Sequence, residues 1–141
     1  MKQEKTLMKN DHNHIRVIVW LFAVLMLFCG CTKKALTEQT YQSIDAETAY
    51  KMMNEESGCL IVDVRRPVEF EEGHIPGSVN IPLDTLKYEI PEELKNAEGP
   101  VLLYCRSGRR SKEAAGILQG QISAPLYEFG GIIDWPYEIV Q

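Results

Sequence analysis

Apolar positions fall in short runs through the second half of the chain. The segment "CLIVDV" at 59–64 is apolar at successive positions until Asp63, and "PVLLYC" at 100–105 has a similar run; such runs are typical of strands buried on both faces. Shorter apolar segments at 41–44 and 124–135 predict a first and a last strand. Buried strands that alternate with helical segments predict an α/β fold, with a small, mostly parallel sheet flanked by helices.

The segments between these strands have helical patterns. Residues 45–57, "DAETAYKMMNEES", predict a helix that Asp45 caps and that Gly58 ends. Four of its residues share one apolar face: Ala46, Ala49, Tyr50 and Met53. The segments 91–97 and 111–121 predict two further helices.

The N-terminal segment has a different pattern. Residues 1–16 are polar and carry four basic side chains, and thirteen apolar residues follow from Val17 to Cys29. A basic segment before an apolar segment of this length predicts an export signal, because a membrane-spanning helix needs about 20 apolar residues. A buried core helix and an uncleaved signal anchor are the alternatives.

The end of the apolar segment, "LFCGC" at 27–31, resembles a bacterial lipoprotein signal, in which cleavage precedes a lipid-modified cysteine. Gly30 fits the small residue expected before the cleavage site, so Cys31 would receive the diacylglyceryl group. Phe28 departs from the usual leucine. Cys29 fits less well as the acceptor, since Phe28 would then occupy the small-residue position.

This resemblance divides the chain into three parts. Residues 1–30 would be a lipoprotein signal peptide, residues 31–40 the lipidated cysteine and a polar tether, and residues 41–141 one folded domain. The mature protein would be anchored to a membrane by lipid, with fatty acyl groups such as palmitate. Its domain would then lie outside the cytoplasm, at the cell surface or on the periplasmic side.

Charge sets one short segment apart from the rest of the domain. The 141 residues carry a net charge of −5, from 15 basic and 20 acidic side chains. Removal of residues 1–30, which hold four basic and two acidic side chains, leaves 11 and 18, a net charge of −7. This balance argues against nucleic acid as a partner. The segment "YCRSGRRS" at 104–111 nevertheless places three arginines beside one cysteine.

The position of Cys105 points to chemistry. It follows a buried strand, and Gly108 permits a tight loop before the next helix. Loop amides, the helix N-terminus and the arginines would all stabilise a thiolate, which is the reactive form of cysteine. Asp63 and Arg65 follow the other buried strand, so they should lie at the same sheet edge. The alternative is that Cys105 is a small buried apolar residue.

Three motifs resemble the rhodanese family of sulfurtransferases. They are "LIVDVRRPVEFEEGHIPGSVNIP" at 60–82, "VLLYCRSGRRS" at 101–111 and "GGIIDW" at 130–135. The resemblance spans residues 41–136 and implies that Cys105 carries a persulfide. It implies a cradle around that sulfur, formed by Arg106, Ser107, Gly108, Arg109 and Arg110. It also implies supporting roles for Asp63, Arg65 and Glu69, and a structural role for His74.

The resemblance implies a reaction in two steps. Cys105 would take sulfane sulfur from a small anionic donor such as thiosulfate and pass it to a thiol or to cyanide, with no cofactor or metal. A cysteine phosphatase or arsenate reductase is a rival class, but such enzymes use a Cys-x5-Arg loop, whereas the arginine here follows after four residues. A non-catalytic sulfur carrier or binding module is the other alternative.

Two further expectations concern single residues. Cys59 begins one strand and Cys105 ends its parallel neighbour, so the two should lie on the order of 15 Å apart, too far for a disulfide. Arg110 should tie the loop to the scaffold. Arg106 and Arg109 should instead stand at the mouth of the site and attract anions.

Overall fold

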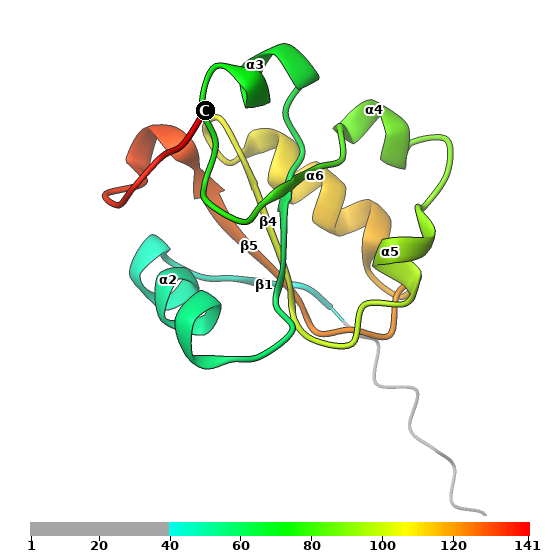
Figure 1. Cartoon of the computed structure of the whole chain (residues 1–141). Helices are drawn as coiled ribbons and strands as arrows, with labels where there is room; N and C mark the ends of the chain where they lie inside the picture. Colours follow the sequence, from blue (N-terminus) through cyan, green and yellow to red (C-terminus); the bar gives the residue numbers. More distant parts are fainter. Residues whose placement is uncertain (1–39) are drawn as a thin grey trace, which may run out of the picture. The chain divides into compact units, whose positions relative to one another are not determined.

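The computed structural model describes residues 40–141, so the predicted signal peptide and Cys31 lie outside the described residues. Five strands form one sheet in the order β1-β5-β4-β2-β3, and every pairing is parallel. The strands are β1 (Gln42–Ser43), β2 (Leu60–Asp63), β3 (Val79–Asn80), β4 (Val101–Cys105) and β5 (Leu126–Gly131). The prediction of an α/β fold with a mostly parallel sheet is confirmed (Figure 1).

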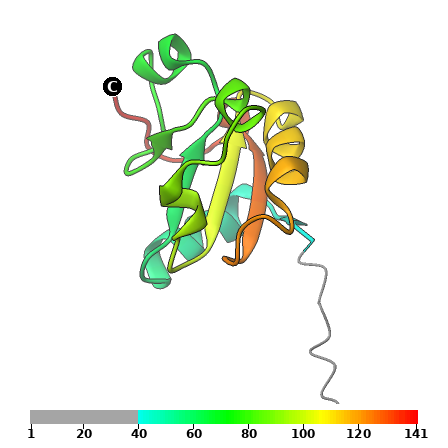
Figure 2. The same cartoon turned by 90° about the vertical axis from the view of Figure 1, so that its right-hand side faces the viewer.

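Helices cover both faces of the sheet. They are α2 (Ala46–Glu55), α3 (Pro67–Glu71), α4 (Leu83–Leu86), α5 (Glu92–Lys95) and α6 (Arg109–Leu118), and a 3₁₀ turn, η1, spans Ile132–Asp134. Figure 2 shows α6 on one side of the strands. A core of buried residues from α4, α5 and α6 packs on that face, and a second core that includes Ala49 of α2 packs on the other.

The first helix forms as its sequence predicts. The Asp45 carboxylate accepts a 2.7 Å hydrogen bond from the backbone amide of Thr48, which caps α2 at its first turn. Ala49 is fully buried, whereas Tyr50 at 40% exposure stays at the surface and stacks on Tyr137. The predicted apolar face is therefore only partly buried.

Central strand β4 is buried at every residue. Its side chains alternate between the two cores, so that Leu103 and Cys105 face α6 while Leu102 and Tyr104 face the opposite side. Burial on both faces explains why the sequence of β4 is continuously apolar rather than alternating.

One predicted boundary differs from the structure, and two short elements were not predicted. Helix α6 begins at Arg109, two residues before the predicted start, because Gly108 at φ +92° already turns the chain into its first helical position. The two-residue strand β3 and the short helix α4 were not predicted, since neither is long enough to show a period.

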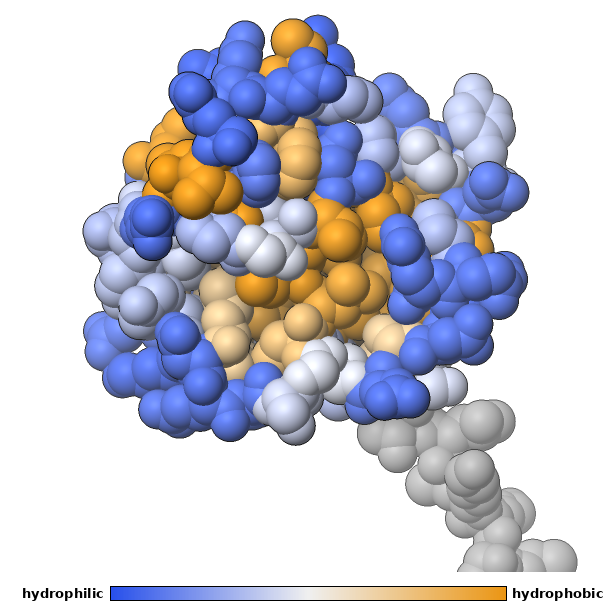
Figure 3. Space-filling view, viewed as in Figure 1, coloured by the Kyte–Doolittle hydropathy of each residue, from blue (hydrophilic) through white to orange (hydrophobic). Residues whose placement is uncertain are grey.

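The face of the domain seen in Figure 1 carries both apolar and hydrophilic residues. On the face seen in Figure 1, apolar residues gather at the centre and hydrophilic residues surround them (Figure 3). Within residues 40–141, no helix is both long enough and apolar enough to cross a bilayer.

Candidate active site

Cys105 is the last residue of β4, at the carboxyl edge of the sheet. The chain leaves the strand there, turns through residues 106–108 and enters α6 at Arg109. The left-handed backbone of Gly108 makes this reversal possible. Cys105 itself is 1% exposed, so its sulfur lies at the base of the loop.

The loop places hydrogen-bond donors around the Cys105 sulfur. The backbone amide of Gly108 donates to Sγ at 3.1 Å. Burial would raise the pKa of the thiol, but the backbone amides of Ser111, Ser107 and Gly108, with the Ser111 hydroxyl, together lower it below its ordinary value. The site is thus built to hold a thiolate, the nucleophilic form of cysteine.

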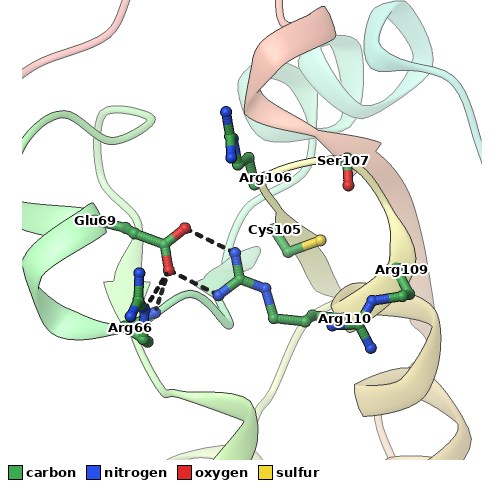
Figure 4. A pocket seen from close by; sticks show the side chains of 7 residues that line it. All are labelled: Arg66, Glu69, Cys105, Arg106, Ser107, Arg109 and Arg110. Atoms are coloured by element: carbon green, nitrogen blue, oxygen red, sulfur yellow. Dashed lines mark hydrogen bonds and ion pairs between the residues drawn. The ribbon is translucent and has the colours of Figure 1, made fainter.

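A cavity of about 290 Å³ opens over this sulfur. Figure 4 shows its lining side chains, which come from the loop, from α6 and from the region of α3. They are Arg66, Glu69, Cys105, Arg106, Ser107, Arg109 and Arg110. Four of the seven are arginines, so the cavity favours a small anion.

Arg110 fixes the first turn of α6 to α3. Its guanidinium donates two hydrogen bonds of 2.8 Å to the two oxygens of Glu69. The side chain of Arg66 reaches the same carboxylate at 3.1 Å. These bonds, above all those from Arg110, hold the pKa of Glu69 well below its usual range. Arg110 therefore faces the scaffold and does not stand free at the mouth of the cavity.

The other two loop arginines point elsewhere. The side chain of Arg109 is 78% exposed and lies 3.6 Å from Glu113, one helical turn along α6. Arg106 is exposed as well. In Figure 4 both side chains lie away from Glu69, to which Arg110 is turned. They are placed to meet an approaching anion rather than to brace the loop.

Asp63 and Arg65 lie below the cavity and do not line it. The Arg65 guanidinium binds the Asp63 carboxylate, with distances of 2.6 and 2.8 Å to Oδ2, and donates to the carbonyl of Gly73 at 2.6 Å. Both side chains are buried. The pair thus connects the end of β2 to Gly73, just after α3, and α3 itself carries Glu69.

His74 also lies in this supporting segment. Its ring stacks on Phe70 at 3.8 Å between centroids, and Nδ1 lies 3.0 Å from the carbonyl oxygen of Phe70. Its backbone pairs with Val140 near the C-terminus. His74 does not line the cavity, and these contacts agree with the structural role inferred for it.

Sequence reasoning missed two residues behind the sulfur. Ser111 and Glu128 are both buried, and the Ser111 hydroxyl lies 3.8 Å from Cys105 Sγ and 3.2 Å from Glu128 Oε2. A charged residue inside the apolar strand "LYEFGG" was the signal that could have pointed to Glu128. Position 111 was predicted only as the start of the helix over 111–121.

Cys59 takes no part in the site. It precedes β2, whose Leu60 pairs with Val101, so Cys59 lies near the opposite end of the sheet from Cys105. Neither of these two cysteines forms a disulfide. In the part of the chain that the structure describes, no group of His, Cys, Asp and Glu side chains is arranged to hold a metal ion.

Comparison with known proteins decides the family. The model of the rhodanese-like domain matches residues 45–135. The chain belongs to the rhodanese family. A sulfurtransferase of Allochromatium vinosum is 33% identical over 93 residues, which cover 65% of this chain and 85% of that protein. A thiosulfate sulfurtransferase of Pseudomonas syringae is 36% identical over 91 residues, 61% of this chain and 84% of that protein.

Solved structures show the same rhodanese fold. The crystal structure of a rhodanese-related protein from Thermoplasma volcanium superposes with a TM-score of 0.58 at 30% identity, over 71% of this chain and 98% of that one. The match of the family model, residues 45–135, lies within the domain predicted for residues 41–141, and sulfur transfer in general is the activity that the family supports.

Proposed function

We propose that this protein is a thiosulfate sulfurtransferase in which Cys105 carries the transferred sulfur as a persulfide. The observation that carries the proposal is a buried thiol with a lowered pKa at the base of a cavity with four arginines. A thiolate is a nucleophile for sulfane sulfur, and the arginines favour an anionic donor. The names of the relatives agree with this choice of donor.

The first half-reaction forms the persulfide. The Cys105 thiolate attacks the outer sulfur of thiosulfate, the sulfur–sulfur bond of the donor breaks, and sulfite leaves with the bonding electron pair. The backbone amides of Ser111, Ser107 and Gly108 act on the Cys105 sulfur and would stabilise negative charge there. Donors that are already oriented stabilise that charge without reorganising.

The second half-reaction returns the thiolate. A thiolate acceptor or cyanide attacks the outer sulfur of the persulfide, and Cys105 Sγ leaves with the electron pair. Two displacements on sulfur replace one difficult transfer. The reaction consumes no oxidant or reductant beyond donor and acceptor.

The loop favours sulfur over a phosphoryl group. A cysteine phosphatase needs an arginine that is free to bind phosphate. Here both terminal guanidinium nitrogens of Arg110 donate to Glu69. The next position is Ser111, which is buried and donates to the Gly108 carbonyl at 2.9 Å. A phosphatase or arsenate reductase is therefore disfavoured.

A sulfur carrier without turnover is the second candidate function. It would use the same persulfide on Cys105 but hand it only to a protein partner. Turnover of thiosulfate and cyanide to thiocyanate by the full-length chain, lost in Cys105→Ser, supports the enzyme. Persulfide on Cys105 without thiocyanate production supports the carrier. If thiosulfate produces neither persulfide nor thiocyanate, both candidate functions are contradicted.

We also propose that the domain is held outside the cytoplasm by lipid on Cys31. Support comes from the order of basic, apolar and Gly-Cys segments in residues 1–31. Cys31→Ser should abolish labelling by a fatty-acid analogue and leave the precursor unprocessed. Labelled lipid on that variant, while Cys29→Ser loses it, would move the attachment to Cys29.

A further inference from the structure

Glu128 is a buried carboxyl group without a cation. It lies on β5 at 2% exposure, beside Leu103 of β4, and its side chain contacts Ser111 of α6. Its hydrogen-bond donors are the hydroxyls of Ser43 and Ser111 and the backbone amide of Gly130. Within residues 40–141 no Lys, Arg or His forms an ion pair with it.

Ser111 joins this carboxyl group to the nucleophile. Its hydroxyl oxygen lies 3.2 Å from Glu128 Oε2 and 3.8 Å from Cys105 Sγ. The carbonyl oxygens of Gly108 and Gly130 lie at 2.9 and 3.3 Å from the same atom. A hydroxyl has one proton to donate and can also accept one. Ser111 can therefore donate to only one acceptor at a time: the sulfur, the carboxylate or one of the two carbonyl oxygens.

The other charged groups around the site are already engaged. Arg110 on α6 is bound to Glu69 of α3 and is close enough to Cys105 to be stabilised by its negative charge. Arg109 pairs with Glu113 further along α6. At the end of β2, Asp63 and Arg65 bind each other, and β1 offers only the Ser43 hydroxyl. In the part of the chain that the structure describes, the thiolate thus has a nearby cation, whereas the Glu128 carboxylate pairs with none.

We propose that Cys105 and Glu128 share one proton through the hydroxyl of Ser111, so that the thiolate and the carboxylate exclude each other. In the transfer, the Sγ–H bond of Cys105 breaks as Ser111 Oγ takes that proton. The original Ser111 proton passes to Glu128 Oε2, so one negative charge moves from carboxylate to sulfur. Glu128 is then a positioning residue, because it acts on the nucleophile only through Ser111.

Two consequences follow for Cys105. With Glu128 protonated, the Ser111 hydroxyl can donate to the sulfur and stabilise the thiolate. With Glu128 ionised, that hydroxyl turns to the carboxylate, and a like charge stands behind the sulfur, which disfavours the thiolate.

The test is the pH dependence of Cys105 alkylation. Full-length protein is reacted with iodoacetamide from pH 5 to 10, and the rate at Cys105 is read from its peptide by mass spectrometry. The Cys59 peptide serves as an internal control. Glu128→Gln keeps the size and hydrogen-bonding capacity of the side chain but cannot ionise. The midpoint of the pH profile of Cys105 alkylation should therefore fall by about one pH unit. Ser111→Ala removes a donor to the thiolate and should raise the midpoint.

The opposite signs distinguish this proposal from a purely structural role. If Glu128 only holds β1, β5 and α6 together, Glu128→Gln lowers stability but leaves the midpoint unchanged, and the proposal fails. It also fails if Ser111→Ala does not raise the midpoint, which remains measurable should Glu128→Gln not fold. Glu113→Gln removes an exposed carboxylate from the same helix and should move the midpoint little, since water screens that charge.

This inference rests on Cys105 being the sulfur-carrying residue of the proposed function, but its test does not use turnover. A protein that transfers no sulfur would refute the proposed function while its alkylation profile still reports the proton sharing. A protein with normal turnover and an unchanged midpoint in Glu128→Gln would refute the proton sharing alone.

Discussion

Arg110 and Glu69 form an ion pair through two hydrogen bonds of 2.8 Å, which connects the helix after the Cys105 loop to the helix after β2. Their side chains are 20% and 15% exposed, so the pair is largely shielded from water. The loop is consequently held from both sides, by β4 at Cys105 and by α3 at Arg110. The geometry of the amides around the sulfur depends on this second attachment.

Removing the attachment should impair every donor alike. Arg110→Ala should lower kcat/KM roughly tenfold or more for thiosulfate and for an uncharged persulfide donor, because the amides lose their fixed positions. Arg110→Lys keeps the charge but not the contact through two nitrogens, so its kcat/KM should lie between those of the unmodified protein and Arg110→Ala. Steady-state kinetics of each variant with both donors measure these losses in kcat/KM. A loss confined to thiosulfate would instead mean that Arg110 binds the anion.

The same pair should make stability depend on acid. Because the hydrogen bonds from Arg110 hold the pKa of Glu69 below the ordinary 4.5, the pair stabilises the fold fully above about pH 4.5 and less as pH falls toward the lowered pKa. Urea unfolding should show Glu69→Gln less stable by about 2 kcal/mol at pH 7, and the difference should shrink below pH 4.5. A difference that stays constant with pH would contradict the assignment.

Arg109 should act through its charge. Its exposed guanidinium can attract an anionic donor over a distance, an effect that salt screens. Arg109→Glu should lower kcat/KM for thiosulfate about fivefold or more at low ionic strength, with a much smaller effect on an uncharged donor or at high salt. Lys112→Glu makes the same charge change on α6 outside the cavity and serves as the control. Equal losses for both donors, unchanged by salt, would make Arg109 structural.

Gly131 should be required for the shape of the loop. A Cβ atom there would collide with the carbonyl oxygen of Arg106 and with the Cα atom of Ser107, so the loop must shift. Gly131→Ala should therefore lower turnover strongly while the domain still folds. Gly116→Ala is the matched control, because its Cβ would meet nothing within 4 Å, and in helix α6 it should add up to about 1 kcal/mol of stability. Normal turnover in Gly131→Ala would show that the loop adapts.

The sequence was informative where one pattern had one structural solution. Runs such as 60–63 and 101–105 can be buried only in the middle of a layered fold, and Cys105 at the end of one run fixed the edge where the site would lie. The special backbone of Gly108 likewise marked the turn into α6.

The rest depended on contacts between segments far apart in the chain. Nothing near Glu69 indicates that its partner is Arg110, 41 residues later. Glu128 contacts Ser111, and through Ser111 is connected to Cys105, because β5 lies beside β4 and directs the Glu128 side chain toward α6. The start of α6 at Arg109 was missed because three polar residues hide the apolar period of its first turn.

The proposed function requires transferable sulfur on Cys105. Full-length protein should be incubated with thiosulfate, and the mass of the Cys105 peptide measured by mass spectrometry before and after addition of cyanide. We predict a gain of one sulfur atom on that peptide alone, and its loss to thiocyanate when cyanide is added. No gain at Cys105, or a gain that appears equally on the Cys59 peptide or survives cyanide, would contradict a transferable persulfide on this residue.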